Sequence, residues 1–418
     1  MNENTDKNIT PFKNLSWALF IGSTCMWTAF MTTVMQLTLK MVSVDPSGYT
    51  KSYGLVTSIG ALISLIANPL GGFIGDRTRA KFGKRRTWIL IGSILGSILI
   101  VLMGVSTQIW QVATIFVLLQ LVYNFVVAAF TALIPDQCPE EKRGTLSGIN
   151  GMTLVAGVMI GNVFVHFVWN HSQLGFYIIL AAIGIIGALI SVYLLKDNPA
   201  EARKDSSEAE IKDRGQIYPS FKKYPSFTWA LLVKFFYALG TGGASYITIM
   251  LINRMHLSSA YVASVFSIVT MIATVLSALT SYAGGILSDK FKKQKIFMYV
   301  AALIAMFGTL MYAFSNNIIM VIVAIIITNM AGGIFNAVDS ALVTRVLPPD
   351  GDNGKNFGIM NVANSLPQTI VPAIAPMLLQ LGTKTAMGQW PFFYVVLAIG
   401  VSLSLICLKP IPDIGKES

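Results

Sequence analysis

The chain has 418 residues, of which 54% are hydrophobic and only 12% are charged. Soluble globular proteins carry about 25% charged residues, so a water-exposed fold is excluded and a lipid-exposed one is indicated. The net charge of +11 does not indicate nucleic-acid binding, because the basic residues lie in short runs between apolar segments, as in membrane proteins. The three cysteines, Cys25, Cys138 and Cys407, lack disulfide-framework or metal-ligand spacing, and we expect neither a metal nor a cofactor.

Twelve segments are long and apolar enough to cross the roughly 30 Å of a bilayer's hydrocarbon core. In chain order they are 15–40, 50–75, 87–106, 109–134, 145–169, 174–195, 227–252, 258–287, 296–315, 318–347, 355–382 and 389–408. Residues 1–14 lack the form of a signal peptide, since the apolar run after them is too long and no small-residue cleavage site follows. We therefore expect an all-α integral membrane protein with twelve transmembrane helices, the first of them retained.

The positive charges predict how these segments are oriented. If residues 1–14 are a cytoplasmic tail, the loops alternate sides, and the outer loops hold Lys40, Lys51, Arg254 and Lys384. Nearly every other lysine and arginine then falls on the cytoplasmic side, as the positive-inside rule requires. We expect a multi-pass protein of the cell membrane with both termini in the cytoplasm.

The longest polar stretch, 196–226, lies midway along the chain and mixes seven basic with six acidic residues. It is typical of a solvated cytoplasmic linker. We expect it to join two pseudo-symmetric six-helix bundles, 15–195 and 227–409, with a short cytoplasmic tail at 410–418.

The two bundles repeat short motifs. GGFIGD (71–76) is matched by GGILSD (284–289), and ALIPD (132–136) is matched by VLPPD (346–350). Parallel repeats of this kind are the architecture of transporters whose halves rock around a solute site.

These motifs carry a family resemblance. GGFIGDRTRAKFGKRR (71–86) resembles the signature loop between the second and third helices of the major facilitator superfamily, and GGILSDKFKKQK (284–295) is similar to that family's second copy. Gly83 follows Asp76 by seven residues rather than the commoner three. This longer loop and TALIPDQCPEEKRGTLSG (131–148) are similar to the glycoside–pentoside–hexuronide cation symporters and the sucrose-transporter-like proteins.

The resemblance implies the major facilitator fold, but one departure bears on the coupling ion. Melibiose-permease-like members of the family place cation-binding aspartates inside helices of the first half. Here no acidic residue lies within a predicted span of the first bundle. We therefore expect protons, and less so sodium, as the coupling ion.

The resemblance also implies a cytoplasmic gate. Gly71, Gly72 and Gly75 would let segment 50–75 approach segment 355–382 closely, and Asp76 would face the start of that segment, where the helix dipole favours an anion. The alternative is that the basic loop only binds anionic lipid, at about 1 kcal/mol per charge. The candidate gating residues are Gly72, Asp76, Arg77, Gly83, Arg85, Arg86, Gly285 and Asp289.

Only two ionisable residues lie deep inside the predicted spans, Lys234 and Asp339. A charge at mid-bilayer is unfavourable by about 2.5–3.5 kcal/mol, so such residues are usually functional or paired. At 1.5 Å per residue both lie roughly 10–13 Å from the cytoplasmic side, so they can pair. We hypothesise that Asp339 binds and releases the coupling proton while Lys234 tunes its proton affinity. The alternatives are a structural ion pair, or Lys234 reaching to the cytoplasmic surface.

Polar side chains at helical spacing mark the segments that line the central cavity in the superfamily. Segment 15–40 carries Thr24, Thr28, Thr32 and Gln36 on one face, and segment 227–252 continues such a face from Lys234 through Tyr237 and Thr241. Amides, hydroxyls and aromatic rings suit an uncharged polyhydroxylated solute. The alternative is that these groups hydrogen-bond neighbouring helices, at about 0.6–2 kcal/mol per contact. The candidate cavity residues are Trp27, Thr28, Gln36, Tyr123, Asn124, Tyr237, Thr241, Asn336, Asn361, Asn364 and Gln368.

Glycines of segment 145–169 recur along the helix, and we expect them to serve close packing rather than chemistry. They are Gly148, Gly151, Gly157 and Gly161. Small residues of this kind let two transmembrane helices approach each other closely.

The sequence favours a secondary transporter over other membrane functions. A primary pump would need a phosphate-binding loop of the form G-x-x-x-x-G-K-[ST], and the sequence contains none. Three histidines and one buried aspartate do not supply the catalytic cluster of an enzyme. We expect proton-coupled symport of a sugar or glycoside by alternating access, with the lipid bilayer, a small solute and protons as partners, and no nucleic acid. Two alternatives stay open: an exporter of lipophilic drugs or organic cations, and a non-transporting solute sensor.

Overall fold

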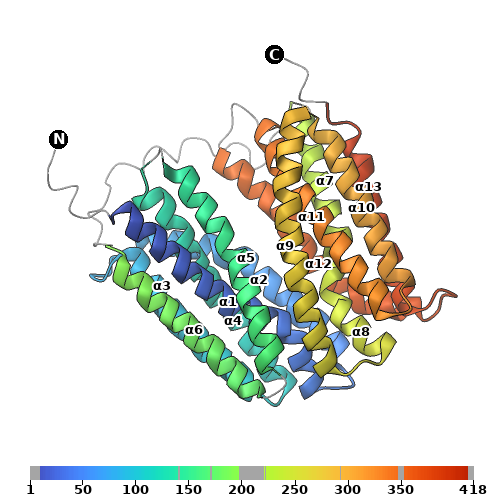
Figure 1. Ribbon diagram of the computed structural model, residues 1–418, viewed down its shortest axis with the longest axis horizontal. Helices are drawn as coiled ribbons and strands as arrows, with labels where there is room; N and C mark the ends of the chain where they lie inside the picture. Colours follow the sequence, from blue (N-terminus) through green and yellow to red (C-terminus); the bar gives the residue numbers. More distant parts are fainter. Residues whose placement is uncertain are drawn as a thin grey trace. The chain divides into compact units, whose positions relative to one another are not determined.

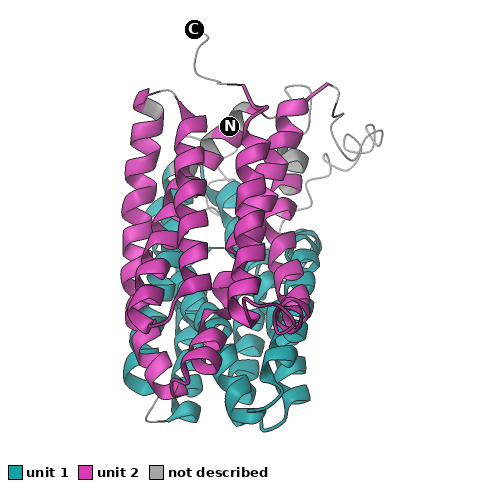
Figure 2. Cartoon of the chain, turned by 90° about the vertical axis from the view of Figure 1, so that its right-hand side faces the viewer, with its two compact units in different colours: residues 1–209 teal, residues 210–418 magenta. Residues whose placement is uncertain are grey.

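The computed structural model describes residues 10–139, 142–169, 172–196, 221, 223–291, 293–346 and 353–412, and within these ranges it is all helical (Figure 1). Its described residues form twelve spans that are long and apolar enough to cross a membrane, which confirms the predicted fold class. The chain divides into two compact units, Met1–Ala209 and Glu210–Ser418, coloured separately in Figure 2. The division falls inside the stretch that the sequence marks as a linker.

The described residues of unit 1 form six α-helices, a structure that satisfies backbone hydrogen bonds internally, as lipid requires. They are α1 (Phe12–Val44), α2 (Tyr49–Arg77), α3 (Lys84–Val105), α4 (Ile109–Gln137), α5 (Arg143–Val168) and α6 (Gln173–Leu194). In α3 the exposed residues Ile91, Ile94, Leu95, Ile98 and Leu102 recur at helical spacing. They form an apolar stripe on one helix face, which suits contact with lipid.

The described part of unit 2 also contains six spans, although one of them is broken. Its elements are α7 (Pro225–Thr241), the 3-10 helix η3 (Gly242–Tyr246), α8 (Ile247–Met255), α9 (Ser259–Phe291), α10 (Gln294–Phe314), α11 (Ile318–Val346), α12 (Asn353–Gly382) and α13 (Gln389–Leu408). Together α7, η3 and α8 make the single span Pro225–Met255.

The break corrects the prediction of one continuous helix over 227–252. Glycine is a poor helix former, and Gly240, Gly242 and Gly243 cluster where the α-helix changes to 3-10 spacing. The glycines are also needed for packing, since a Cβ at Gly240 would lie 2.5 Å from the backbone nitrogen of Val401 in α13. The seventh span therefore changes from α to 3-10 spacing next to the point where Gly240 packs against α13.

The two units repeat one interaction at the ends of their helices. Lys40, near the end of α1, donates from Nζ to the carbonyl oxygen of Gly104 in the last turn of α3, at 3.0 Å. Arg254, near the end of α8, donates from Nη1 to the carbonyl oxygen of Ala313 in the last turn of α10, at 2.9 Å. A cation stabilises a helix C-terminus by meeting its unpaired carbonyls and its negative dipole end. In each unit, therefore, the first span caps the third.

Candidate functional site

The structure brings the two deeply placed ionisable residues together in unit 2. Lys234 of α7 and Asp339 of α11 form an ion pair, with 2.8 Å between Nζ and Oδ2. Asp339 is 2% exposed, whereas the side chain of Lys234 is 19% exposed. Among the described residues, this is the one ion pair that lies away from the helix ends.

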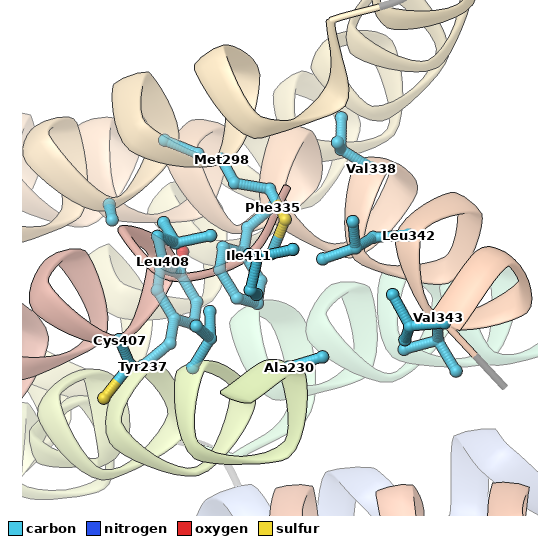
Figure 3. Close-up of a cluster of buried hydrophobic side chains, with 14 of the residues drawn as sticks. Ala230, Tyr237, Met298, Phe335, Val338, Leu342, Val343, Cys407, Leu408 and Ile411 are labelled. Atoms are coloured by element: carbon cyan, nitrogen blue, oxygen red, sulfur yellow. The ribbon is translucent and has the colours of Figure 1, made fainter. Parts of the chain in front are cut away.

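Apolar and aromatic side chains surround this pair. Tyr237 lies one turn beyond Lys234 on α7, and Phe335 lies one turn before Asp339 on α11. Their rings stack in parallel, 3.6 Å apart at an interplanar angle of 2°. Both rings belong to a buried cluster that includes Val338 and Leu342, drawn in Figure 3. The pair is thus held between two helices in an environment with little water, where a charge interaction is stronger than at the surface.

One oxygen of the aspartate is uncommitted. Oδ2 accepts the hydrogen bond from Lys234, but Oδ1 is buried and has no hydrogen-bond partner among the described residues. A buried polar atom without a partner is unfavourable and needs an explanation. A role in taking up and releasing a proton would explain why this oxygen has no hydrogen-bond partner among the described residues.

The other cavity candidates of unit 2 lie in different settings. Thr241 donates its hydroxyl proton to the carbonyl oxygen of Tyr237, 2.9 Å away, at the end of α7. Asn336, on α11, and Asn364 and Gln368, on α12, are exposed. The side chain of Asn361 lies outside the described residues. Their solute contacts stay a prediction.

In unit 1 the polar face of α1 packs against the glycine face of α5. A Cβ at Gly157 would lie 2.6 Å from the Cβ of Trp27, and a Cβ at Gly161 would overlap the hydroxyl of Thr32. The hydroxyl of Thr28 donates to the carbonyl oxygen of Thr24 at 2.9 Å. Much of this stripe therefore meets a neighbouring helix.

The prediction of close packing is confirmed for two of the four glycines. Gly157 and Gly161 approach α1 closely, as described above. At Gly148 and Gly151 the prediction is wrong, because an added Cβ would meet nothing within 4 Å. At 3.6 residues per turn, Gly148 and Gly151 lie on a different side of α5 from Gly157 and Gly161, so the four glycines do not share one packed face.

Three further candidates of unit 1 are partly or fully buried. Gln36 is buried, and its Oε1 has no partner in the described part of the chain. Tyr123 is fully buried, and its ring stacks on that of Phe30 at 4.8 Å. Asn124 joins α4 to α2 by donating to the hydroxyl of Ser64 at 3.1 Å. Oε1 of Gln36 and the hydroxyl of Tyr123 are thus both buried polar atoms without a hydrogen-bond partner among the described residues.

The signature loop forms a charge network around Arg85, the second residue of α3. Its guanidinium, 3% exposed, donates to Asp76 at the end of α2 and, at 2.7 Å from Nε to Oδ2, to Asp136 at the end of α4. Lys84 also contacts Asp136, at 3.0 Å. The network fixes the ends of α2, α3 and α4 relative to one another.

The remaining loop residues have local roles. Gly83 has φ 109°, which only glycine adopts readily, and it precedes α3. The guanidinium of Arg77 lies 3.4 Å from the ring centroid of Phe73, and that of Arg86 lies 4.3 Å from Phe82. These are cation–π contacts, and they hold the basic side chains against the loop.

The glycines of the loop differ in their surroundings. A Cβ at Gly71 would lie 2.9 Å from the Cα of Phe125, so this glycine makes its close approach to α4. A Cβ added at Gly72 would meet no atom within 4 Å, and one added at Gly285 would lie in ordinary van der Waals contact with the Cβ of Ala337. The side chain of Asp289 and those at the start of α12 lie outside the described residues, so the predicted contact of Asp76 there stays a prediction.

Sequence reasoning missed two participants in these networks. Asp136 stands out in the sequence only as part of a repeated Pro-Asp motif, and that repeat was the available signal for its role as a partner of Arg85. Thr10 carries no such signal. Its hydroxyl donates to Oε1 of Gln137 at 2.5 Å and accepts from the backbone nitrogen of Lys196 at 2.8 Å, which joins the start of α1 to the ends of α4 and α6.

Comparisons with known proteins agree with this fold. The family model of the Major Facilitator Superfamily matches residues 15–282 and 263–417. The solved D-xylose-proton symporter superposes with a TM-score of 0.70 over 97% of this chain and 99% of that one, at 16% identity. The nucleoside transporter NupG superposes with a TM-score of 0.68 over 96% and 98%, at 12% identity. At these identities the likeness concerns the fold alone.

Curated relatives are similar over part of their length. The multidrug resistance protein MdtG of Klebsiella pneumoniae (strain 342) is 27% identical over 255 residues, which are 60% of this chain and 59% of that protein. MdtG of Salmonella typhi is 28% identical over 60% of each chain. The match thus spans about three fifths of these relatives. With a family model covering nearly the whole chain and a twelve-span fold to match, the chain belongs to the Major Facilitator Superfamily and is a secondary transporter of that type.

Proposed function

We propose that this protein is a proton-coupled transporter of the cell membrane, with Asp339 as the residue that binds and releases the coupling proton. The observation that carries the proposal is the buried pair of Lys234 and Asp339, in which one carboxylate oxygen has no partner among the described residues. A carboxylate in a membrane interior needs a counter-charge or a proton. Lys234 supplies the counter-charge in this conformation, and a proton supplies the neutralisation when the two separate.

Asp339 exchanges Lys234 for a proton as its partner, and this exchange couples proton binding to alternating access. When Asp339 takes up a proton, its attraction to Lys234 is lost, and α7 and α11 are free to move apart along the Tyr237–Phe335 stack. Release of the proton restores the pair and favours the arrangement described here. Proton movement through 100 mV provides about 2.3 kcal/mol, which supports roughly fifty-fold accumulation of a neutral solute.

We further propose that the solute is a sugar or a glycoside. Exposed amides on α11 and α12, namely Asn336, Asn364 and Gln368, can bond hydroxyl groups. A charged solute would need a fixed counter-charge, and the one deep pair of the described residues is already committed to itself.

Replacing Asp339 with Asn tests the coupling role. In proteoliposomes, we expect Asp339→Asn to lose accumulation driven by a pH gradient while it retains counterflow exchange, because exchange needs no net proton movement. The matched control is Asp45→Asn. The carboxylate of Asp45 lies outside the spans and accepts a hydrogen bond from the backbone nitrogen of Gly48 in the same turn, so this variant should accumulate solute like the unchanged protein. If Asp339→Asn accumulates solute normally, the pair is structural and the coupling role is refuted.

A second candidate function is export of lipophilic drugs or organic cations. It is favoured by the curated relatives, since the MdtG proteins of two genera, 27–28% identical to this chain, are named multidrug resistance proteins. An exporter would use the same proton site in the opposite direction. Cells that express the chain would then retain less of a cationic dye than cells that express Asp339→Asn, and equal retention would exclude this candidate.

A further inference from the structure

A small cavity with several hydroxyl groups in its lining lies beside the break in the seventh span, entirely within unit 2. Its volume is about 20 Å³, and it is lined by Gly240, Thr241, Gly243 and Ala244 of the seventh span and by hydroxyl-bearing residues of three other helices. These are Thr309 and Tyr312 of α10, Thr328 of α11 and Tyr394 of α13. One water molecule needs about 10–15 Å³, so the cavity accommodates a single water-sized guest.

The hydrogen bonds around the cavity define what the guest must be. Thr309 donates its proton to the carbonyl oxygen of Ala305 at 2.8 Å, and Thr328 donates its own to Ala324 at 2.8 Å. Because the proton of Thr328 is used there, the 2.9 Å bond between Thr328 and Tyr312 takes its proton from the tyrosine.

The two remaining hydroxyl groups follow the same rule. Thr241 donates to the carbonyl oxygen of Tyr237 at 2.9 Å, and Tyr394 donates to that of Gly243 at 3.3 Å. Every hydroxyl proton of the lining is thus committed, and what these groups still offer is lone pairs. The guest must therefore donate hydrogen bonds or carry positive charge, which a water molecule or a small cation does.

Charge decides between these two guests. The guanidinium of Arg254 donates to the carbonyl oxygens of Tyr312 and Ala313, at 3.4 and 2.9 Å, next to the cavity lining. A cation bound beside it would be repelled in an environment of low dielectric constant. Among the described residues, no carboxylate lines the cavity to offset this repulsion. A neutral donor fits the site better.

We propose that this cavity is a hydration site that holds one water molecule, which bridges the 3-10 segment of the seventh span to α10 and α11. Helices are distorted at glycines and where water enters the backbone ladder, and here the glycines of the seventh span lie in the lining of the cavity. The water supplies hydrogen bonds at the point where the helix changes from α to 3-10 spacing. The inference does not depend on the proposed substrate or coupling ion.

Hydroxyl-radical footprinting with X-rays tests the site in the full-length protein, because a bound water generates radicals that oxidise the aromatic rings beside it. Tyr312 and Tyr394 are almost fully buried, so bulk solvent reaches them poorly. We expect both to be oxidised several-fold faster than Tyr123, which is equally buried and packed against Phe30. Equally slow oxidation of all three would overturn the proposal.

A variant and a titration locate and identify the guest. Thr309→Ile fills the cavity with apolar atoms and should remove the fast oxidation, whereas Thr274→Ile on α9, away from the cavity, should keep it. Fast oxidation that survives in Thr309→Ile would place the water elsewhere and refute the site. Protection of Tyr312 and Tyr394 by sodium or potassium, but not by N-methylglucamine, would show that the guest is a metal cation and would refute the water.

Discussion

Removing either member of the Lys234–Asp339 pair should destabilise unit 2, but by unequal amounts. Lys234→Met leaves Asp339, which is 2% exposed, without its counter-charge. Breaking a buried pair in this way typically raises the free energy of the folded state by about 3–5 kcal/mol. Because the lysine side chain is 19% exposed, part of the interaction is screened, and we expect a value near the lower end of that range.

The reverse change should be milder. Asp339→Asn leaves a lysine whose long side chain can carry its charge toward water while its methylenes stay buried. Asparagine also keeps an oxygen within reach of Nζ, so we expect a loss of about 1.5 kcal/mol, the low end of the range for one hydrogen bond to a charged group. The double variant has no isolated buried carboxylate, and it should be more stable than Lys234→Met alone.

Denaturant-induced unfolding of the purified protein in detergent measures all three variants in one double-mutant cycle. The measured quantity is the change in the free energy of unfolding of each variant relative to the unchanged chain. Equal losses for the two single variants, or losses that simply add in the double variant, would contradict the reasoning, because neighbours in one interaction must couple.

Three further changes probe the packing and charge networks, each measured as the midpoint of thermal unfolding in detergent. Gly161→Ala should destabilise the protein by about 1–3 kcal/mol through overpacking against α1. Gly151→Ala, whose added methyl group meets open space, should not destabilise it. A larger loss in Gly151→Ala than in Gly161→Ala would refute the described α1–α5 contact. Arg85→Met should lose about 1–3 kcal/mol, since it removes charged hydrogen bonds that join three helices; an unchanged midpoint would show that the network adds no stability. Lys40→Met should lose about 1 kcal/mol by uncapping α3, and a loss of the same size in the exposed Lys51→Met would contradict the capping role.

Much of the fold can be predicted from the sequence because a membrane span must be a long apolar segment. Apolar length gives the twelve spans, and the scarcity of buried charge identifies Lys234 and Asp339 as partners. When only one acid and one base lie deep in the predicted helices, little choice is left. The family followed from the loop at 71–86, whose residue types and order are specific.

The sequence does not show in the same way which helix or solvent each polar face contacts. Helical spacing places Thr24, Thr28 and Thr32 on one side of α1, but it does not say whether that side meets water or another helix. The answer lay in α5, where Gly157 leaves room for the backbone of Thr24 and Thr28, and Gly161 leaves room for the side chain of Thr32. Only the three-dimensional pairing of the two helices connects the two patterns.

The break in the seventh span was missed for a related reason. Hydrophobicity and polar spacing are nearly the same in an α-helix and in a single turn of 3-10 helix, so neither marks the change at Gly242–Tyr246. The cluster Gly240, Gly242 and Gly243 was the available signal. Its meaning depends on α13, whose close approach requires glycine at Gly240 and Gly243.

Proton-coupled movement of a sugar is the central claim, and a record of internal pH in proteoliposomes tests it most directly. The purified protein is reconstituted, and a panel of mono- and disaccharides is added outside while a trapped dye reports the pH. We predict acidification on addition of at least one sugar, abolished by a protonophore and absent in Asp339→Asn. No acidification with any sugar would contradict the claim, and acidification that persists in Asp339→Asn would contradict the role of the Lys234–Asp339 pair.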